Sequence, residues 1–258
     1  MDRSTSYAHL MPVVIAHVSD IHIDSGARAA ERARRVFAYL DALPADLDAV
    51  VVTGDIADHG LDAEYQTVRD LTALRHPVLI GPGNHDDRAA FRRALLGVEA
   101  STEPIDQVLR TERFVVVHCD SSIPRRDDGF LADSTLEWLA AEIDATPAGV
   151  PVLVAFHHPP VELHVPYVDA IRQSGEERLA ATLAGRPNVV ALLAGHAHTA
   201  AATRFAGLPL LVAPGVVSTT VLPWEGGDQV VRLDQPPSLA FHVIGDDRRV
   251  TTHYRTVV

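Results

Sequence analysis

Five short apolar runs constrain the fold of this chain more than any other feature. They cover residues 13–18, 49–52, 78–80, 152–156 and 189–193, and they consist almost entirely of aliphatic side chains. Continuous apolar runs of this length are typical of strands that are buried on both faces of a sheet. Helical patterns separate the first three runs, over residues 28–43 and 62–74. This alternation predicts βαβ units and a parallel sheet.

The rest of the chain extends this pattern and then changes it. We expect helices over residues 87–96, 134–145 and 176–183, and a strand over 113–118. Beyond His198 we expect no helix, only short strands at 201–205, 208–213, 229–233, 239–244 and 250–254. The prediction is an α/β fold: a four-layer α/β/β/α sandwich in one domain, residues 1–258. Its parallel-rich sheet packs on a second, largely antiparallel sheet from the C-terminal part.

Composition narrows the class of protein. The chain of 258 residues has 34 acidic and 22 basic side chains, a formal net charge of −12, which argues against nucleic-acid polymers and anionic membranes as partners. The single cysteine, Cys119, cannot form a disulfide within the chain, which fits a reducing compartment. Residues 1–10 lack the features of a signal sequence, and no apolar run is long enough to cross a bilayer. We therefore expect a cytoplasmic protein.

The loop after each of the five runs carries side chains that can bind metal ions. The carboxyl ends of parallel strands meet at one edge of a sheet, so these loops should lie together. Imidazole and carboxylate together suit manganese, iron or zinc. Seven ligands are too many for one tetrahedral ion and suit two ions that share a carboxylate, for which Asp55 is the candidate. The candidate ligands are Asp20, His22, Asp55, Asn84, His157, His196 and His198.

One isolated His-x-His is more often a pair of surface histidines than a metal site. The five fragments together, in this order, resemble the calcineurin-like metallophosphoesterase superfamily from about residue 13 to 198. Its pattern is D-x-H, G-D, G-N-H-[D/E], a histidine near proline, and G-H-x-H. The fragments here are Asp20-Ile21-His22, Gly54-Asp55, Gly83-Asn84-His85-Asp86, His157-His158-Pro159 and Gly195-His196-Ala197-His198.

The resemblance implies a ligand set for each of two metal ions. The first ion would be held by Asp20, His22, Asp55 and His198, and the second by Asp55, Asn84, His157 and His196. His85 matches the family's histidine near the scissile phosphate, where it could protonate the leaving oxygen or hydrogen-bond the phosphate. The ions would be manganese, iron or zinc.

Within the superfamily, the chain is similar to the class III cyclic-nucleotide phosphodiesterase branch. Its motif ends in Asp86 where protein phosphatases have glutamate, and their G-D-x-x-D-R-G stretch is absent. This branch implies a phosphodiesterase that attacks small diesters with a metal-bridging hydroxide, the substrates being 3′,5′- or 2′,3′-cyclic nucleotides or glycerophosphodiesters. A phosphomonoesterase or nucleotide pyrophosphatase on the same core is the alternative, ahead of a nuclease or a non-catalytic scaffold. Relatives in this branch are often homodimers, although nothing in the sequence marks an interface.

Several neighbouring residues have open roles. His158 should support its loop, and His17 should be a core histidine. His164 and Tyr167 belong to a loop, residues 157–170, that should overhang the site; surface positions are the default for both. Asp86 should either orient His85 or cap the next helix. We also expect Asp24 and Asp58 to be plain loop residues, and the arginines of residues 28–35 to form a solvated helix face.

Overall fold

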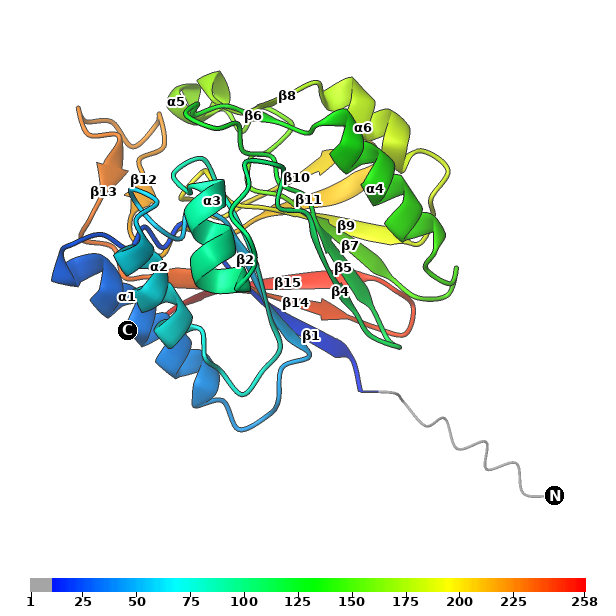
Figure 1. The fold of residues 1–258 in the computed structure, drawn as a ribbon, viewed down its shortest axis with the longest axis horizontal. Helices are drawn as coiled ribbons and strands as arrows, with labels where there is room; N and C mark the ends of the chain where they lie inside the picture. The colour runs from blue at the N-terminus through cyan, green and yellow to red at the C-terminus, as the bar shows by residue number, and fades with distance from the viewer. Residues whose placement is uncertain (1–10) are drawn as a thin grey trace.

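Two mixed β-sheets packed face to face form the centre of the molecule. The computed structural model describes residues 11–258 (Figure 1). The first sheet has the order β15-β14-β1-β2-β3 and the second β10-β11-β9-β7-β5-β4. The first consists of Val250–Thr256, Ser238–Ile244, Val13–Val18, Ala49–Thr53 and Val78–Gly81; the second of Ala201–Phe205, Leu208–Val212, Val189–Ala194, Val152–Ala155, Val115–His118 and Gln107–Arg110.

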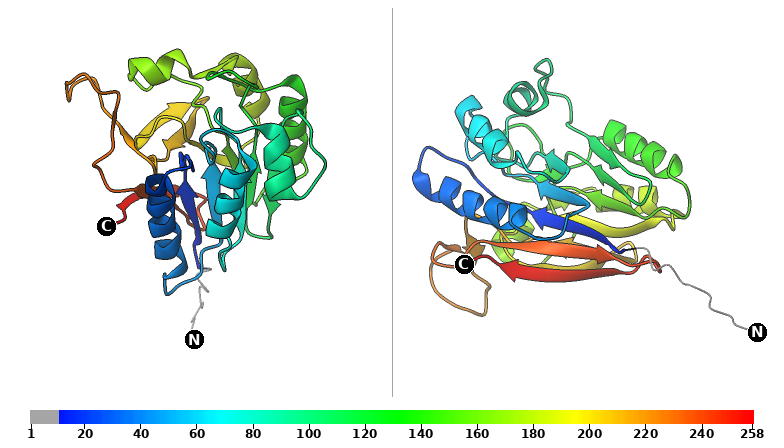
Figure 2. Two further views of the ribbon diagram at one scale, coloured as in Figure 1. Left: turned by 60° about the vertical axis from the view of Figure 1, so that its left-hand side comes forward. Right: turned by 90° about the horizontal axis from the view of Figure 1, so that it is seen from below.

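Helices cover both outer faces of this pair of sheets (Figure 2). The first sheet is covered by α1, Ala27–Asp41, and α2, Asp62–Leu71, and the second by α4, Asp133–Asp144, and α6, Glu176–Leu183. Short helical segments complete the fold: α3, Arg88–Phe91, the π-helical turn η1, Arg92–Leu96, and α5, Pro166–Ala170. Two small strand pairs, β12–β13 (Thr219–Thr220, Val231–Arg232) and β6–β8 (Gly129–Phe130, Gln173–Ser174), lie outside the main sheets.

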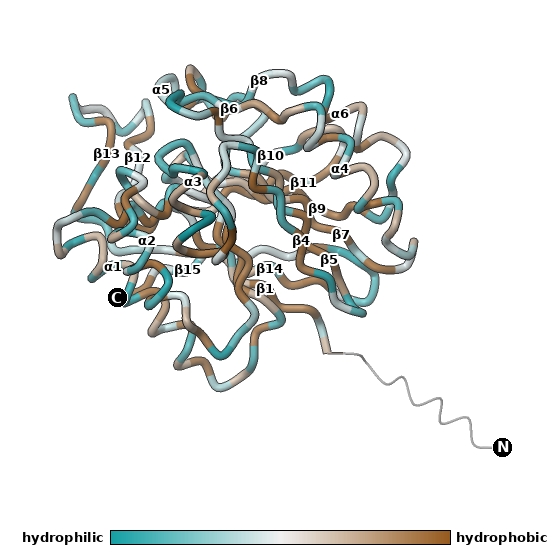
Figure 3. Tube along the Cα trace, viewed as in Figure 1, coloured by the Kyte–Doolittle hydropathy of each residue, from teal (hydrophilic) through white to brown (hydrophobic). Residues whose placement is uncertain are grey.

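Three hydrophobic clusters correspond to the three interfaces between four layers. Successive residues of a strand point to opposite faces, so one strand contributes to two interfaces. In β2, Val50 packs with α1 and α2, whereas Val51 packs against the second sheet. The third cluster joins β7 and β9 to α4 and α6. The most hydrophobic parts of the chain accordingly run along the central strands (Figure 3).

The predicted α/β fold with two packed sheets is confirmed, with one difference in how the strands are divided. We expected the C-terminal strands to form most of the second sheet by themselves. Instead, β10 and β11 extend the second sheet, while β14 and β15 extend the first beside β1. The second sheet therefore has parallel strands at its centre and antiparallel pairs at both edges, whereas the first has antiparallel strands at one edge and the parallel strand β3 at the other. Pairing partners of edge strands depend on long-range contacts that local patterns do not encode.

Most predicted elements lie within a few residues of the observed ones. The helix expected over residues 87–96 is broken into α3 and η1, and the strand expected over 229–233 shrinks to the two residues of β13. The expectation for residues 1–10 lies outside the described part of the chain. Within residues 11–258, none of the helices has both the length and the apolar character that a membrane span requires.

Candidate metal centre

The loops at the carboxyl ends of five parallel strands meet where the two sheets come together. Backbone hydrogen bonds join them directly: Asp20 N–H donates to Gly54 O at 3.2 Å, and Gly195 N–H donates to His157 O at 2.9 Å. The approach is close enough to require glycine at position 195, where a Cβ would lie 1.9 Å from Ser19 Oγ. All seven candidate ligands and His85 are carried on these loops.

Five of the candidate ligands hold their backbone in the left-handed region. The φ angles are 55° for Asp20, 46° for His22, 49° for Asp55, 66° for His196 and 49° for His198. Residues other than glycine rarely adopt this conformation, and each instance costs about 1–3 kcal/mol. The fold therefore sustains considerable local strain in order to aim these side chains inward. Strain of this kind gathers at functional sites.

Four side chains form one half of the centre. Asp20, His22, Asp55 and His198 each offer a donor atom, and these four atoms lie within 4.8 Å of one another. His22 Nε2 is 3.2 Å from His198 Nε2 and 3.4 Å from Asp55 Oδ2. His198 Nε2 is 3.4 Å from Asp20 Oδ1. The set equals the ligand set that the resemblance implied for the first ion.

The other half shares Asp55 with the first. Asp55 Oδ2 lies 3.3 Å from His157 Nε2, so one carboxylate oxygen lies near a histidine of each half. His157 Nε2 is also 3.1 Å from Asn84 Oδ1 and 3.2 Å from His196 Nδ1. The structure thus places Asp55, Asn84 and His196 each within 3.3 Å of His157 Nε2, and these, with His157, are the four side chains that would hold a second ion.

Outer hydrogen bonds determine which histidine nitrogens face inward. His157 Nδ1 lies 2.6 Å from the Thr53 carbonyl, which can only accept, so Nδ1 carries a hydrogen and Nε2 is the nitrogen turned toward the centre. His22 Nδ1 donates in the same way to Asp58 Oδ1 at 2.9 Å. His198 Nδ1 pairs with Ser218 Oγ at 2.7 Å. Such outer partners are typical of metal-binding histidines, whose free nitrogen they orient.

Polar atoms inside the centre are left without protein partners. Asp20 Oδ2 and His196 Nε2 are buried and have no hydrogen-bond partner, which is costly unless something else satisfies them. Two ring nitrogens also face each other, His22 Nε2 and His198 Nε2, 3.2 Å apart. A cation beside them would take both as ligands and would satisfy Asp20 Oδ2. The donor set therefore fits transition-metal ions.

The charges of the centre are strongly coupled. Burial lowers the pKa of His157, but the Asp55 carboxylate outweighs it and raises that pKa to about 9. Burial likewise opposes ionisation of Asp55, yet His157 and His22 hold its pKa well below the usual value. Burial lowers the pKa of both His196 and His198. The site therefore favours an anionic Asp55 opposite positive charge, whether protons or metal ions supply it.

His158 lies close to His157 and His196, near enough for the three to form a further geometric cluster. Both of its ring nitrogens are already engaged. Nε2 donates to Asp127 O at 3.1 Å, and Nδ1 lies 2.9 Å from Ser121 Oγ, from which it accepts. Burial and the neighbouring His157 lower its pKa to about 3. His158 thus has no free lone pair and ties the loop of residues 121–129 to the end of β7.

Asp58 and Asp86 have roles that the sequence did not show. Asp58, expected to be a plain loop residue, orients His22 through its carboxylate and His85 through its backbone carbonyl, 2.9 Å from His85 Nδ1. Asp86 does neither of the two things expected of it. Its carboxylate accepts from Gly83 N–H, Ala57 N–H and the Tyr65 hydroxyl at 2.8 to 3.1 Å, which locks two ligand loops together. The residue that caps α3 is Asp87.

A cleft of about 480 Å³ opens over the centre. Its floor includes His22, Asp55, Asn84, His196 and His198, and His85 lines its side. The half-exposed His85 lies edge-on to His22, with ring centroids 4.6 Å apart. Tyr167 also lines this cleft, whereas the exposed His164 does not. The open metal-type floor and the accessible His85 allow a phosphate group to approach from solvent.

Comparison with known proteins agrees with this geometry. Residues 13–200 match the family described as calcineurin-like phosphoesterase, so the chain belongs to that family. It is 35% identical over 229 residues to a probable cyclic nucleotide phosphodiesterase of Rhodococcus erythropolis, covering 83% of this chain and 74% of the relative. It is 32% identical over 247 residues to the glycerophosphodiester phosphodiesterase GpdQ of Enterobacter lignolyticus, covering 89% and 86%.

The fold comparison points the same way. A dimetal phosphatase from Danio rerio superposes with a TM-score of 0.65 at 16% identity, covering 95% of this chain and 99% of that one. This likeness concerns the fold alone. The predictions of a calcineurin-like phosphoesterase, of an enzyme and of a likeness to cyclic-nucleotide phosphodiesterases are confirmed.

Proposed function

We propose that this protein is a metal-dependent phosphodiesterase that hydrolyses small diesters, 3′,5′- or 2′,3′-cyclic nucleotides in particular. The observation that carries the proposal is Asp55, whose Oδ2 lies 3.4 Å from His22 Nε2 and 3.3 Å from His157 Nε2 at the floor of an open cleft. A carboxylate in that position can serve two cations at once. Two transition-metal ions held there would supply the charge that polarises a phosphoryl group and acidifies water.

The chain's own residues divide into ligands, orienting groups and a phosphate contact. Asp20, His22, Asp55 and His198 hold one ion, and Asp55, Asn84, His157 and His196 hold the other. Asp58, Thr53 and Ser218 keep three of the histidines in the tautomer and orientation that ligation requires. Asn84 contributes a neutral oxygen, so the second ion is held by less negative charge than the first.

His85 is the group placed to act on the substrate. Its Nδ1 is held by the Asp58 carbonyl at 2.9 Å, so its other ring nitrogen is free for the cleft that the ring lines. From there it can hydrogen-bond a phosphate oxygen, and in its protonated form it can donate to the leaving oxygen. Because the leaving group of a diester is an alkoxide, a proton donor at this position lowers the cost of its departure.

The names of the two relatives support different diesters. Cyclic nucleotides are the substrate class named for the Rhodococcus relative and glycerophosphodiesters for the Enterobacter one. A phosphomonoesterase or nucleotide pyrophosphatase on the same centre is the alternative activity. The acidic net charge supports a small substrate over a nucleic-acid polymer. A homodimer, a cytoplasmic location and the choice among manganese, iron and zinc stay predictions, as does the single domain.

The experiment compares a diester with a monoester. Purified protein loaded with manganese should hydrolyse bis-p-nitrophenyl phosphate at least ten times faster than p-nitrophenyl phosphate, and it should convert cyclic nucleotides to monophosphates. Asn84→Ala should abolish turnover while circular dichroism stays unchanged. Faster hydrolysis of the monoester would favour the phosphatase alternative. Unchanged turnover in Asn84→Ala would contradict the proposed metal centre.

A further inference from the structure

Residues 216–235, here called the arm, form one wall of the cleft over the metal centre. The arm leaves the second sheet after β11, carries β12 and β13, and returns to the first sheet at β14; it rises on the same side of the molecule as α5 (Figures 1 and 2). Its apolar contributions to the cleft are Val217, Val230, Val231 and Leu233. Ser218 and Thr220 bond to His198, so the base of the arm touches the candidate ligands.

The opposite wall comes from α5 and the residue that follows it. Tyr167, Val168 and Ile171 face the cleft there. Large apolar side chains are unusually exposed on both walls: Tyr167 is 61% exposed, Val230 48% and Leu233 56%. They are three of the ten exposed large hydrophobic residues within the described chain. Apolar surface left open in two parts of the lining of one cleft is typical of a ligand groove that binds an apolar group.

The charge of the cleft limits which substituents fit between these walls. Asp24, Asp58 and Asp127 contribute carboxylates to its lining. Within the described residues, neither arginine nor lysine lines it. A second phosphate group on the substrate would therefore meet negative charge without a cation to pair with. An uncharged, flat organic group, such as the base of a cyclic nucleotide, suits both the apolar walls and the acidic rim.

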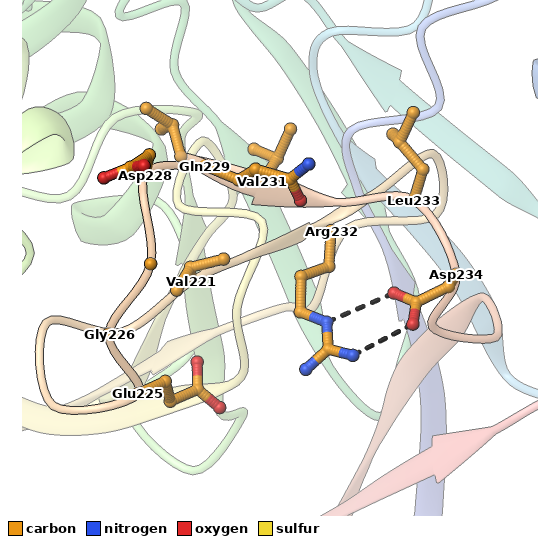
Figure 4. A pocket seen from close by; sticks show the side chains of 11 residues that line it. Val221, Glu225, Gly226, Asp228, Gln229, Val231, Arg232, Leu233 and Asp234 are labelled. Carbon is orange, nitrogen blue, oxygen red and sulfur yellow. Dashed lines mark hydrogen bonds and ion pairs between the residues drawn. The ribbon is translucent and has the colours of Figure 1, made fainter.

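The outer part of the arm is a thin wall with little strand pairing of its own. The β12–β13 pairing has only two residues in each strand. A second hollow of about 740 Å³ lies within the arm itself, where the Arg232–Asp234 ion pair borders it (Figure 4). Val230, Val231 and Leu233 line both hollows. With open space on either side, contacts at the two ends of the arm contribute strongly to the position of this wall.

Two arginines of α1 hold both ends of the arm. Arg28 donates to Val217 O at 2.8 Å and to Leu233 O at 2.6 Å. Arg32 donates to Val216 O at 2.7 Å and to Gln235 O at 2.8 Å. Each guanidinium thus links the incoming and the outgoing segment of the arm. The expectation of a solvated arginine face is wrong for these two residues, and Arg32 is only 9% exposed.

We propose that the arm and α5 together hold the organic group of the substrate, with Leu233 as a specificity-determining residue and Arg28 and Arg32 as positioning residues that keep the arm over the metal centre. This inference rests on the proposed phosphodiesterase function. It assigns the phosphate to the metal centre and the base to the slot between the two walls. A diester that has no large organic group to place in the slot gains no binding affinity from it.

The test compares two substrates in three variants. Leu233→Ser and Arg28→Gln should each raise KM for 3′,5′-cyclic AMP about tenfold. Both variants should leave kcat and KM for methyl ribofuranoside 3,5-cyclic phosphate, which has the same diester ring but no base, within about twofold of the wild-type values. Arg35→Gln is the matched control, because Arg35 lies on the same helix and pairs only with the exposed Glu31. This variant should change kcat and KM for neither substrate. Arg32→Gln is left as a confirmatory variant, since its burial endangers folding.

A second readout follows the arm directly. Trp224 lies on the arm and is 72% exposed, whereas the other tryptophan, Trp138, lies on α4. In a Trp138→Phe background, Arg28→Gln should lower the fluorescence anisotropy of Trp224, and Arg35→Gln should not. An equal rise in KM for both substrates, or no change for either, would overturn the role of the arm but not the phosphodiesterase function. A wild-type protein that hydrolyses neither substrate would instead overturn the phosphodiesterase function and the arm's role with it.

Discussion

Two groups of largely buried histidines in this protein lie a short distance apart and differ in their place in the fold and in what some of their ring nitrogens meet. The first comprises the centre's His22, His157, His196 and His198, on loops at strand ends. The second comprises His17, His118 and His242, which lie within β1, β5 and β14 and are fully buried. The alternation of side chains along these strands turns all three toward the space between the sheets. Burial alone therefore does not distinguish a metal site from a core.

The difference lies in what the ring nitrogens meet. His17 uses both nitrogens, toward His242 Nε2 at 3.0 Å and Thr53 Oγ1 at 2.9 Å, and His242 Nδ1 meets Thr252 Oγ1 at 2.9 Å. Burial lowers the pKa of His118 to about 4 and of His242 to about 3. In the centre, carboxylates face His22 and His157, and their pKa values are raised despite burial. The carboxylate partner, rather than an unsatisfied nitrogen, is what marks a place built for cations, because both ring nitrogens of the core residue His118 also lack a hydrogen-bond partner.

The largest expected effect separates the two groups by activity. Asp55→Asn removes the charge that faces both halves of the centre, so diester hydrolysis should fall by more than about a thousandfold. Bound metal, measured by elemental analysis, should fall below two ions per chain. Asp70→Asn, on the exposed face of α2, is the control and should retain full activity. If Asp55→Asn retained two bound ions and full turnover, the claim that the centre binds metal through Asp55 would be contradicted.

Asp58→Asn tests the hydrogen bonds that orient the candidate ligand histidines from outside the centre. The variant keeps an oxygen near His22 Nδ1 but loses the charge that raises the basicity of the ring. Metal affinity should fall about 10- to 100-fold, as is common for such partners. Calorimetric titration of the metal-free protein with Mn²⁺ measures it. Asp24→Asn serves as the comparison, because the Asp24 carboxylate bonds Gly26 N–H rather than a histidine. Equal losses in both variants would show a general charge effect.

The pH dependence of metal binding tests the raised pKa of His157. Below a pKa of about 9 this ring is protonated in the metal-free protein, so a metal ion must displace a proton to bind Nε2. Mn²⁺ affinity should therefore rise by up to about tenfold per pH unit between pH 6 and pH 8. The proton release can be measured by calorimetry in buffers of different ionisation enthalpy. An affinity that does not change with pH would contradict the assigned protonation.

The core group should show its pH dependence in stability, because its pKa shift is opposite to that of His157. The folded-state pKa of His118 is lowered to about 4, so between its unfolded value near 6.5 and pH 4 the unfolded chain binds more protons. Stability is then fully present above about pH 6.5 and falls as the pH drops, by about 3 kcal/mol at pH 4 from this residue. Urea unfolding of metal-free protein measures it. His118→Leu should flatten the dependence, and an unchanged slope would contradict the account.

The smallest effect on activity is expected from His242→Leu. The substitution leaves His17 Nδ1 and Thr252 Oγ1 without a partner, and the free energy of unfolding should fall by about 1–3 kcal/mol. Metal content and kcat should stay at wild-type values, because neither nitrogen of His242 faces the centre. A loss of bound metal in this variant would show that the two groups are coupled.

Local sequence patterns predicted the central strands of the fold but not how its edge strands pair. Apolar runs predicted β1, β2, β3, β7 and β9 closely, because buried parallel strands are continuous in hydrophobicity. The edge strand β4, with its partly exposed side chains, lacks that signal and was missed. The division of the C-terminal strands between two sheets depends on which open edge each strand meets. Nothing in the alternation of residues 239–254 distinguishes one edge from the other.

The candidate site followed the same rule. The convergence of its seven side chains could be predicted because each ends a buried strand and the carboxyl ends of parallel strands meet. The outer partners could not, since Asp58 and Ser218 sit at spacings that many loops share. The roles of Arg28 and Arg32 were hidden for another reason. A run of charged residues on a helix predicts that their side chains are exposed to solvent. Only the position of the arm in the folded protein shows that two arginines of this run bond its backbone instead.

The most direct test of the central claim is a crystal structure of the manganese-loaded protein with anomalous scattering data. We expect two peaks on either side of Asp55, one contacted by Asp20, His22 and His198 and the other by Asn84, His157 and His196. A single peak among His157, His158 and His196, or manganese bound only at the protein surface, would contradict it.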